Sequence, residues 1–165
     1  MILKSIVDID LSLLRSFSCG NKDLDNFLNK HAYDNDKNGY GKTYVLIDKN
    51  IIVGFFTICS AQIRFEAFPN KSQLTLPRYP IPSVRIARLG VHKDYQHQGY
   101  GRELLKQAFL KILNVASSIG IKLVIVDAKE SSKSFYEHYG FERLVDDRLT
   151  YFLPIETLLK AFNNK

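Results

Sequence analysis

Cysteine is scarce in this chain, and no stretch of it is long and apolar enough to cross a membrane. Two cysteines, Cys19 and Cys59, occur in 165 residues, too few for the disulfide framework of a small secreted protein. No cluster of cysteine and histidine has metal-ligand spacing, so we expect no metal. No window approaches the roughly 18 to 20 apolar residues of a membrane helix, and the first eight residues have no long apolar stretch. We expect a cytoplasmic protein that does not bind membranes.

Two common nucleotide-binding fingerprints are also missing. The Walker loop requires Gly-Lys-Ser/Thr after four spacer residues, and the dinucleotide fingerprint requires a third glycine three residues after the second. The chain has instead Gly99-Tyr100-Gly101, where an apolar run ending at Val91 gives way to an amphipathic helix. Glycine lets a backbone approach a ligand closely, and the N–H groups and dipole of a helix N-terminus favour an anion. This junction predicts a phosphate site.

Length and composition favour a single domain over residues 1–165, because no compositional break marks a boundary. The formal charge is +6 and the isoelectric point is near 9.3. Such a charge suits an anionic ligand or partner. It does not distinguish a cofactor from a nucleic acid or from a basic surface that only aids solubility.

Helical and extended patterns alternate along the first half of the chain. We expect a first helix that begins after the cap Asn21 and ends near Asn35. Two strands follow as a hairpin, residues 43–47 and 51–58, with a bulge at Gly54.

After the glycine loop, an apolar stripe from Leu104 to Ile119 predicts a long helix packed on the core and ended by Gly120. An all-apolar strand, residues 123–126, is expected to pair in parallel with the strand before the loop. A shorter helix over residues 131–139, a last strand over 150–153 and a fraying tail complete the prediction.

Residues 68–82 hold four of the five prolines and are expected to be extended and irregular. From Ser60 to His92 a single acid, Glu66, faces five basic residues: Arg64, Lys71, Arg78, Arg85 and Arg88. The excess fits a solvated basic face or a groove for an anionic acceptor.

Two motifs resemble the GCN5-related N-acetyltransferase (GNAT) family. Gln96-x-x-Gly99-x-Gly101 resembles its pyrophosphate loop, which reads Gln/Arg-x-x-Gly-x-Gly/Ala. Phe135-Tyr136-x-x-x-Gly140-Phe141 resembles a second family segment, in which the tyrosine points at the thioester sulfur. Both motifs occur in the family's order and at its separation, which makes the pair far more specific than either alone.

The resemblance implies an α/β fold of three layers, αβα. Its central sheet is mixed and largely antiparallel, with about six to seven strands and a parallel pair around the main helix. It also implies acetyl-CoA as cosubstrate of an N-acetyltransferase. The residues implied to bind acetyl-CoA are Leu89, Gly90, Val91, Gln96, His97, Gln98, Gly99, Tyr100, Gly101 and Arg102.

Attack of an amine on a thioester passes through a tetrahedral oxyanion, which backbone N–H donors stabilise. By resemblance those donors lie on Leu89-Gly90-Val91. Tyr136 is then the candidate general acid for the leaving thiolate, a role best matched if its pKa is somewhat lowered. Position alone also fits a core tyrosine with its hydroxyl at the rim.

A general base is harder to identify, because residues 84–93 contain no carboxylate. His92 is a candidate, although a histidine at a strand end also fits a structural role. Without a base an acceptor amine of low pKa is favoured, since an α-amine near pKa 7.7 to 8.0 is partly neutral and a lysine near 10.4 is not.

One position departs from the family pattern. Many family enzymes have serine or asparagine about seven residues before the tyrosine, where this chain has Lys129. Ser131 and Asp127 are candidates to replace it on the cofactor side, and both also fit as helix-cap and strand-end residues.

Residues 17–28 and Tyr79-Pro80-Ile81-Pro82 before Arg88 resemble a branch of the family that includes the acetyltransferase toxins of toxin–antitoxin pairs. That branch implies an aminoacyl-tRNA acceptor, docked by Arg78, Arg85 and Arg88, and an antitoxin partner. A housekeeping or resistance N-acetyltransferase for a small amine or peptide, and a CoA-binding sensor without catalysis, remain alternatives. A tail over residues 155–162 that packs on a second copy would make a homodimer, and a monomer is equally open.

Overall fold

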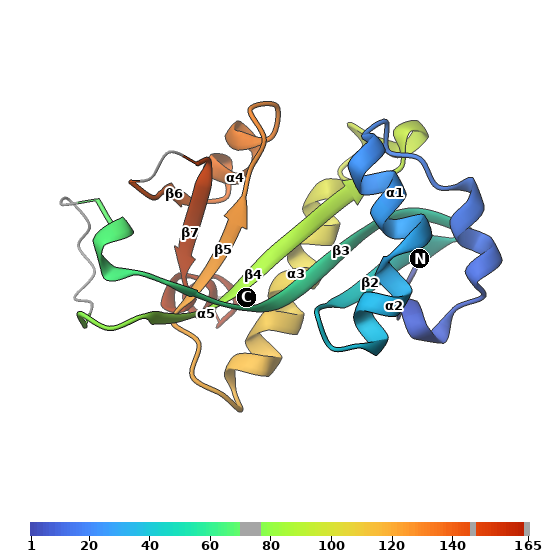
Figure 1. The fold of residues 1–165 in the computed structure, drawn as a ribbon. Helices are drawn as coiled ribbons and strands as arrows, with labels where there is room; N and C mark the ends of the chain where they lie inside the picture. The colour runs from blue at the N-terminus through green and yellow to red at the C-terminus, as the bar shows by residue number, and fades with distance from the viewer. Residues whose placement is uncertain (70–76, 146–147, 164–165) are drawn as a thin grey trace. The chain divides into compact units, whose positions relative to one another are not determined.

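The computed structural model describes residues 1–69, 77–145 and 148–163. Its strands form one mixed sheet in the order β1-β2-β3-β4-β5-β7-β6, as the predicted fold class requires (Figure 1). The chain divides into two compact units, which are described separately. The first contains Met1–Cys59 and Ala87–Ala108, and the second contains Ser60–Ile86 and Phe109–Lys165.

An antiparallel hairpin is the centre of the first unit. Strand β2 (Lys42–Asp48) pairs with β1 (Ile2–Ser5) on one side and with β3 (Ile51–Ile63) on the other. The turn residues Lys49 and Asn50 both have positive φ, 46° and 63°, as the tight turns that fit the twist of a hairpin require. The predicted hairpin is confirmed, and β3 runs on past the predicted end at Ile58.

The predicted bulge at Gly54 is also confirmed. Leu46 lies opposite Gly54 whereas Ile47 lies opposite Ile52, so Val53 is the extra residue. A Cβ atom on Gly54 would lie 2.5 Å from Cδ1 of Leu104 and 2.9 Å from the carbonyl oxygen of Gly90. Glycine here lets helix and strand approach the bulge.

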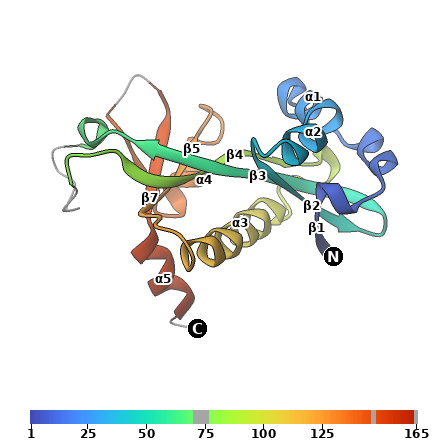
Figure 2. The ribbon, with the colours of Figure 1, turned by 60° about the horizontal axis from the view of Figure 1, so that its bottom comes forward.

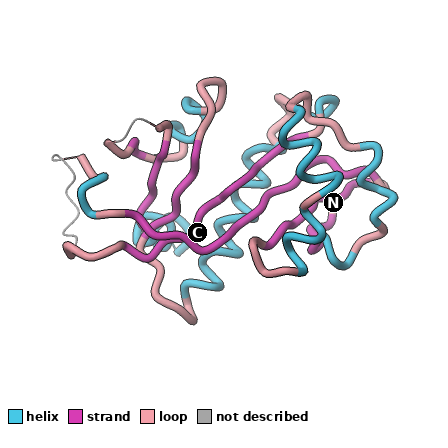
Figure 3. The backbone as a smooth tube through the Cα atoms, in the orientation of Figure 1, coloured by secondary structure: helices cyan, strands magenta, loops and turns pink. Residues whose placement is uncertain are grey.

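The first predicted helix is two helices, α1 (Lys22–Lys30) and α2 (Ala32–Lys37). The Asn21 side chain caps α1 as predicted, accepting hydrogen bonds at 3.1 Å from the N–H groups of Asp23 and Leu24. His31 separates the helices with φ −123°. Both cover one face of the hairpin (Figure 2), and Phe27, Leu28 and Ala32 pack there in the buried core. Figure 3 shows the helical turns before α1, η1 (Ile6–Asp8) and η2 (Leu11–Ser16), which the sequence analysis missed along with β1.

Strand β4 (Ile81–Val91) passes from the second unit into the first. In the second unit its residues Ser83–Ile86 pair in parallel with Leu123–Val126 of β5 (Leu123–Asp127). This confirms the predicted parallel pair. β5 pairs antiparallel with β7 (Thr150–Pro154), which pairs with β6 (Glu142–Arg143).

Helix α3 (Tyr100–Ala116) follows the glycine loop as predicted, but it ends four residues before Gly120. Ile112 is buried, whereas Val115 and Ile119 are exposed. The apolar stripe is therefore core only as far as Ile112, because Ile119 lies beyond the last helical turn.

The predicted fraying tail is wrong, because residues after Pro154 form helix α5 (Ile155–Asn163). Ile155 and Leu158 are buried on one side of it, and Leu159 is exposed. The Ile155 N–H donates to the Lys122 carbonyl, and Lys122 also pairs with Glu156. These contacts hold the first turn.

The proline-rich span lies only partly within the described residues, and Lys71 lies outside them. The C-terminal end of this span is a regular strand, because Ile81 and Pro82 already belong to β4. The Pro82 carbonyl accepts a hydrogen bond from the Lys122 N–H at 2.9 Å. Among the described residues, no helix has the length and apolarity to cross a membrane.

Candidate active site

The glycine loop joins β4 to α3 within the first unit. His97 and Gly99 have φ of 59° and 88°, and the first helical hydrogen bond runs from the Glu103 N–H to the Gly99 carbonyl at 3.1 Å. The N–H groups of Tyr100, Gly101 and Arg102 therefore have no intrahelical acceptor. A Cβ atom on Gly99 would meet nothing within 4 Å, so the backbone conformation and not crowding calls for glycine. The loop has the backbone of an anion site.

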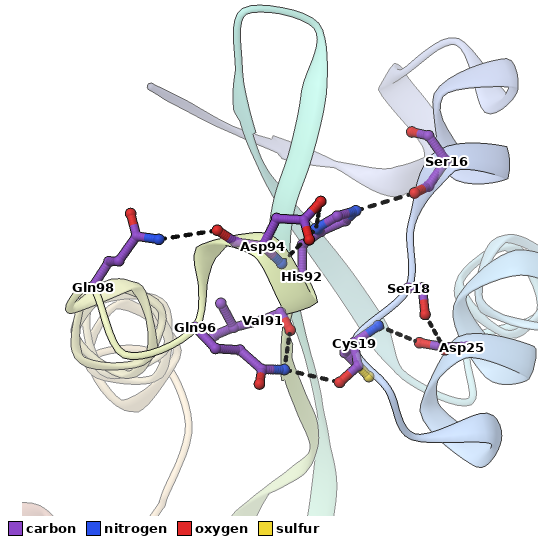
Figure 4. Close-up of polar contacts among 9 residues, drawn as sticks. All are labelled: Ser16, Ser18, Cys19, Asp25, Val91, His92, Asp94, Gln96 and Gln98. Atoms are coloured by element: carbon purple, nitrogen blue, oxygen red, sulfur yellow. Dashed lines mark hydrogen bonds and ion pairs between the residues drawn. The ribbon is translucent and has the colours of Figure 1, made fainter.

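Gln96 begins this loop, and its side chain points into the protein (Figure 4). Nε2 donates to the carbonyl of Cys19 at 2.8 Å and to that of Val91 at 3.0 Å. The Gln98 side chain likewise donates to the Asp94 carbonyl at 2.9 Å. Both glutamines were predicted to bind the cofactor; in this structure their Nε2 groups donate to backbone carbonyls beside the loop.

Residues Ala87–Val91 of β4 run on beyond the ladder with β5, which ends at Ile86. Backbone groups along this part of the strand are thus not used in that pairing. At Gly90 a Cβ atom would lie 3.0 Å from the Phe55 ring. These residues fit the predicted place of the oxyanion donors on Leu89-Gly90-Val91.

His92 is buried at the end of this strand, and both its ring nitrogens are engaged. The Asp94 N–H donates to Nδ1 at 3.2 Å, and Nε2 lies 3.2 Å from the Ser16 carbonyl oxygen (Figure 4). Because Nδ1 accepts from the Asp94 N–H, Nε2 is the ring nitrogen that donates to the Ser16 carbonyl. A base role would require breaking one of these bonds, so we do not assign His92 as the general base.

Tyr136 lies in the second unit on α4 (Lys133–His138). The helix ends as predicted: Gly140 has φ 88°, and the Phe141 N–H donates to the Tyr136 carbonyl at 3.2 Å. The Tyr136 ring is only 8% exposed and packs against Phe135 and Phe141. Burial raises the pKa of Tyr136 to about 12, the opposite of the lowered value that would best suit a general acid. Tyr139 is half-buried.

The turn before α4 is closed by Ser132, and not by the predicted Ser131. The Lys129 N–H donates to the Ser132 hydroxyl at 3.0 Å, while the Ser131 and Lys129 side chains are exposed. Asp127 accepts hydrogen bonds from Arg85 at 2.7 Å and from the Thr150 hydroxyl at 2.9 Å. Both carboxylate oxygens of Asp127 thus accept hydrogen bonds from neighbouring strands of the sheet.

The three arginines predicted to dock an acceptor differ in their surroundings. Arg78 is exposed, and Arg85 is tied to Asp127 by its ion pair. The Arg88 guanidinium lies over the Phe27 ring, 3.6 Å from its centroid, within the first unit. Burial lowers the pKa of Arg88, and the nearby Cys59 partly opposes this effect.

Cys19 and Cys59 are not joined in a disulfide, and both are half-buried. Burial and then the neighbouring Asp25 raise the pKa of the Cys19 thiol to about 11, so this thiol is not an activated nucleophile. In the described part of the chain no three His, Cys, Asp or Glu side chains group as a metal site would need.

Residues 17–28 were predicted to resemble the toxin branch, but none of them was predicted to be a site residue. In the first unit Ser18 and Cys19 lie against the start of the glycine loop, held by Asp25 (Figure 4). Sequence separation hid this, since more than seventy residues lie between Cys19 and Gln96.

A model of the acetyltransferase (GNAT) domain family matches residues 39–143, well over half of the chain. The chain belongs to the GNAT acetyltransferase family. It is therefore an N-acetyltransferase that uses acetyl-CoA, as its glycine loop predicted.

Similar proteins include named toxins. The chain is 31% identical over 134 residues to the "tRNA-acetylating toxin" of Mycobacterium tuberculosis, covering 81% of this chain and 80% of the relative. A solved structure of AtaT with acetyl-methionyl-tRNAfMet is 28% identical, covers 98% of both chains and superposes with a TM-score of 0.87. A tyrosine-to-phenylalanine mutant of AtaT, bound to the C-terminus of the antitoxin AtaR and to acetyl-CoA, is 26% identical, covers 98% of this chain and 97% of that chain and has a TM-score of 0.83.

Proposed function

We propose that this enzyme transfers the acetyl group of acetyl-CoA to the α-amine of an aminoacyl-tRNA. The observation that most supports this proposal is the similarity, along 98% of the chain, to AtaT, whose structure has been solved in complex with an acetylated aminoacyl-tRNA. The Mycobacterium tuberculosis relative, named for acetylating tRNA, supports the same acceptor.

The site supports an acceptor of low pKa. The part of β4 beyond the β5 ladder carries no carboxylate, and His92 uses both its nitrogens within the protein. An α-amine is partly neutral at pH 7 to 8, whereas a lysine amine is almost entirely protonated. A site without a strong base therefore suits an α-amine.

The reaction we propose is direct attack on the thioester. The pyrophosphate of acetyl-CoA binds the N–H groups of the glycine loop and the first turn of α3, Gly99 to Arg102. The thioester carbonyl oxygen accepts from backbone N–H groups of Leu89-Gly90-Val91 as the amine adds and negative charge develops on it. The carbon–sulfur bond then breaks, and CoA leaves as a thiolate.

Tyr136 is the group we assign to this thiolate. With a pKa of about 12 the phenol is fully protonated at pH 7, so its O–H is available as a donor. A free thiol has a pKa of about 8.5, so full transfer of the proton would be uphill by about 5 kcal/mol. Tyr136 therefore stabilises the thiolate mainly as a hydrogen-bond donor.

For the RNA we propose Arg88 and Arg78 as phosphate contacts. Arg88 presents a half-buried positive charge over the Phe27 ring, and Arg78 is exposed. Arg85 is the weaker candidate, because a phosphate would compete with Asp127 for its guanidinium.

The decisive assay follows thiol release from acetyl-CoA with purified aminoacyl-tRNA as acceptor. We expect turnover with charged tRNA and none with uncharged tRNA. Tyr136→Phe should lower kcat by about 10²- to 10³-fold, the usual loss when one hydrogen-bond donor to a developing negative charge is removed. Tyr139→Phe removes a hydroxyl three residues along the same segment and should change kcat less than about threefold. Equal losses in both variants would count against the role of Tyr136.

Two alternatives are separated by the same assay. Turnover on polyamines, aminoglycosides or peptides, with none on charged tRNA, would identify a housekeeping or resistance enzyme. Binding of acetyl-CoA in a calorimeter without turnover on any amine would identify a sensor.

Growth tests the toxin assignment. We propose that the chain acts in the cytoplasm, that its two units form one domain, and that an antitoxin restrains it, as AtaR binds AtaT. Wild type should arrest a bacterial host, and Tyr136→Phe should not. Equal growth of both strains would refute toxicity while leaving the acetyltransferase activity standing.

A further inference from the structure

A polar network joins residues 16–25 to the end of β4 within the first unit (Figure 4). Three backbone carbonyls of the N-terminal segment accept hydrogen bonds from the strand end and the loop. The Ser16 carbonyl accepts from His92 Nε2 at 3.2 Å, that of Ser18 from the Lys93 N–H at 2.8 Å, and that of Cys19 from Gln96 Nε2 at 2.8 Å.

Asp25 fixes the conformation of this segment from inside α1. Its Oδ2 accepts from the Ser18 hydroxyl at 2.9 Å and its Oδ1 from the Cys19 N–H at 2.7 Å. Burial opposes its charge, but these hydrogen bonds outweigh that effect and hold the pKa of Asp25 below its usual range. Gly20 follows with φ 82°. A charged carboxylate thus determines where the Cys19 carbonyl points.

Gln96 transmits this position to the glycine loop. Its two amide protons are both used, one on Cys19 and one on Val91, so the amide bridges the N-terminal segment and the strand that precedes the loop. His97, with φ 59°, comes next in the chain. Any shift of the Cys19 carbonyl therefore shifts the beginning of the loop.

We infer that Asp25 is a positioning residue for acetyl-CoA, acting through Cys19 and Gln96 on the glycine loop. The inference rests on the proposed use of that loop for the cofactor pyrophosphate. A loop held in its binding geometry before the ligand arrives binds more tightly, since less freedom is lost on binding. Asp25 and the Gln96 side-chain amide supply that constraint through their hydrogen bonds within the protein.

The test is calorimetric titration of the full chain with acetyl-CoA, with no acceptor present. Gln96→Glu keeps the shape of the side chain but turns a donor toward two carbonyl oxygens into an acceptor, so we expect the Kd for acetyl-CoA to rise about tenfold. Asp25→Ala should raise it by a similar factor. Saturating acetyl-CoA should restore kcat to within about twofold of wild type, a split that general loss of structure would not produce.

Two further variants provide comparisons. Gln107→Glu makes the same substitution on α3, where the Gln107 amide donates only to Glu103, and should leave the Kd unchanged. Gln98→Glu adds the same negative charge to the glycine loop. It measures how much of any loss of affinity for acetyl-CoA comes from repulsion between this charge and the pyrophosphate. If Asp25→Ala does not fold, Ser18→Ala removes one of the hydrogen bonds to the same carboxylate and should raise the Kd about two- to threefold.

Hydrogen exchange provides a second readout. Acetyl-CoA should slow exchange of the amides from Cys19 to Leu24 in wild type and not in Gln96→Glu, because that bridge is then broken. Wild-type Kd values in both Asp25→Ala and Gln96→Glu would overturn the inference while leaving the proposed function intact. Failure of the wild type itself to bind acetyl-CoA would defeat the proposed function instead.

Discussion

Single residues in this enzyme are constrained by contacts that lie far away in sequence. Gly54 and Gly90 are both required by close approach: one faces Leu104 and the other faces Phe55. The Arg88 guanidinium stacks over the Phe27 ring of α1, and the Gln96 amide donates a hydrogen bond to the Cys19 carbonyl. The residue type or side-chain position at each of these sites depends on a neighbour that only folding brings close.

Gly54→Ala should destabilise the protein by about 1 to 3 kcal/mol, the range for overpacking a core. The added methyl group would clash with Leu104 and with the Gly90 carbonyl at 2.9 Å, and that carbonyl is backbone and cannot swing away. Urea unfolding gives the change in free energy. Gly120→Ala is the matched control, since a Cβ atom there meets nothing within 4 Å, and a loss as large in that variant would contradict the explanation.

The burial of Tyr136 predicts how the stability of the protein changes at alkaline pH. Its pKa is about 12 in the folded protein, against about 10 when exposed, so the folded state holds the proton more tightly. Stability due to this group is complete below about pH 10 and is lost as the pH rises to about 12, by about 2 to 3 kcal/mol. Urea unfolding from pH 9 to 11.5 should show a shallower decline for Tyr136→Phe than for wild type. Parallel declines would mean that the phenol is not buried.

At the scale of the element, helix ends place the functional groups. α3 begins where Gly99 takes a positive φ, and α4 ends where Gly140 does. α1 begins at a side-chain cap, so the Ser18–Gly20 turn is held between Asn21 and Asp25. The turns at these ends matter more to the site than the helical interiors do.

Asn21→Ala should cost about 1 kcal/mol of stability, because two N–H groups of α1 lose their acceptor. The cap also adjoins the turn that anchors Gln96, so we expect a small rise in the KM for acetyl-CoA. Thermal unfolding and steady-state kinetics measure the two effects. Asn26→Ala, exposed in the middle of the same helix, should be neutral or slightly stabilising; a matching loss there would point to helix propensity and away from capping.

At the scale of the whole molecule, charge and sheet topology decide what the enzyme can bind. The formal charge of +6 favours a polyanion. The parallel pairing of β4 with β5 stops at Ile86, so the strand that carries Gly90 continues past it. Neither property belongs to a single residue or helix.

The KM for aminoacyl-tRNA should therefore rise steeply with salt. A plot of its logarithm against the logarithm of salt concentration should lose about one unit of slope in Arg78→Ala, as expected when one phosphate contact is removed. Lys160→Ala, an exposed cation on α5, should leave the slope unchanged. A slope near zero in the wild type would argue against an RNA acceptor.

The sequence by itself determined the family, the cofactor and most elements, because these depend on local signals: two glycines at a strand–helix junction, a Gly-Phe helix end after Tyr136, and periodic apolar residues. It failed where structure depends on partners distant in the chain. α5 was missed because its buried side was not recognised in a short terminal stretch, and the last apolar residues of the α3 pattern proved exposed.

Only the tertiary structure decided what several site residues do. The sequence predicted Gln96 as a cofactor-binding residue and His92 as a possible base, but in the fold their side chains contact the carbonyls of Cys19 and Ser16. Burial by Phe135 and Phe141 raised the pKa of Tyr136, and the motif carries no sign of that. The physical reason is that motifs encode backbone geometry near one point of the chain, whereas burial, hydrogen-bond partners and pKa values depend on every segment that packs there.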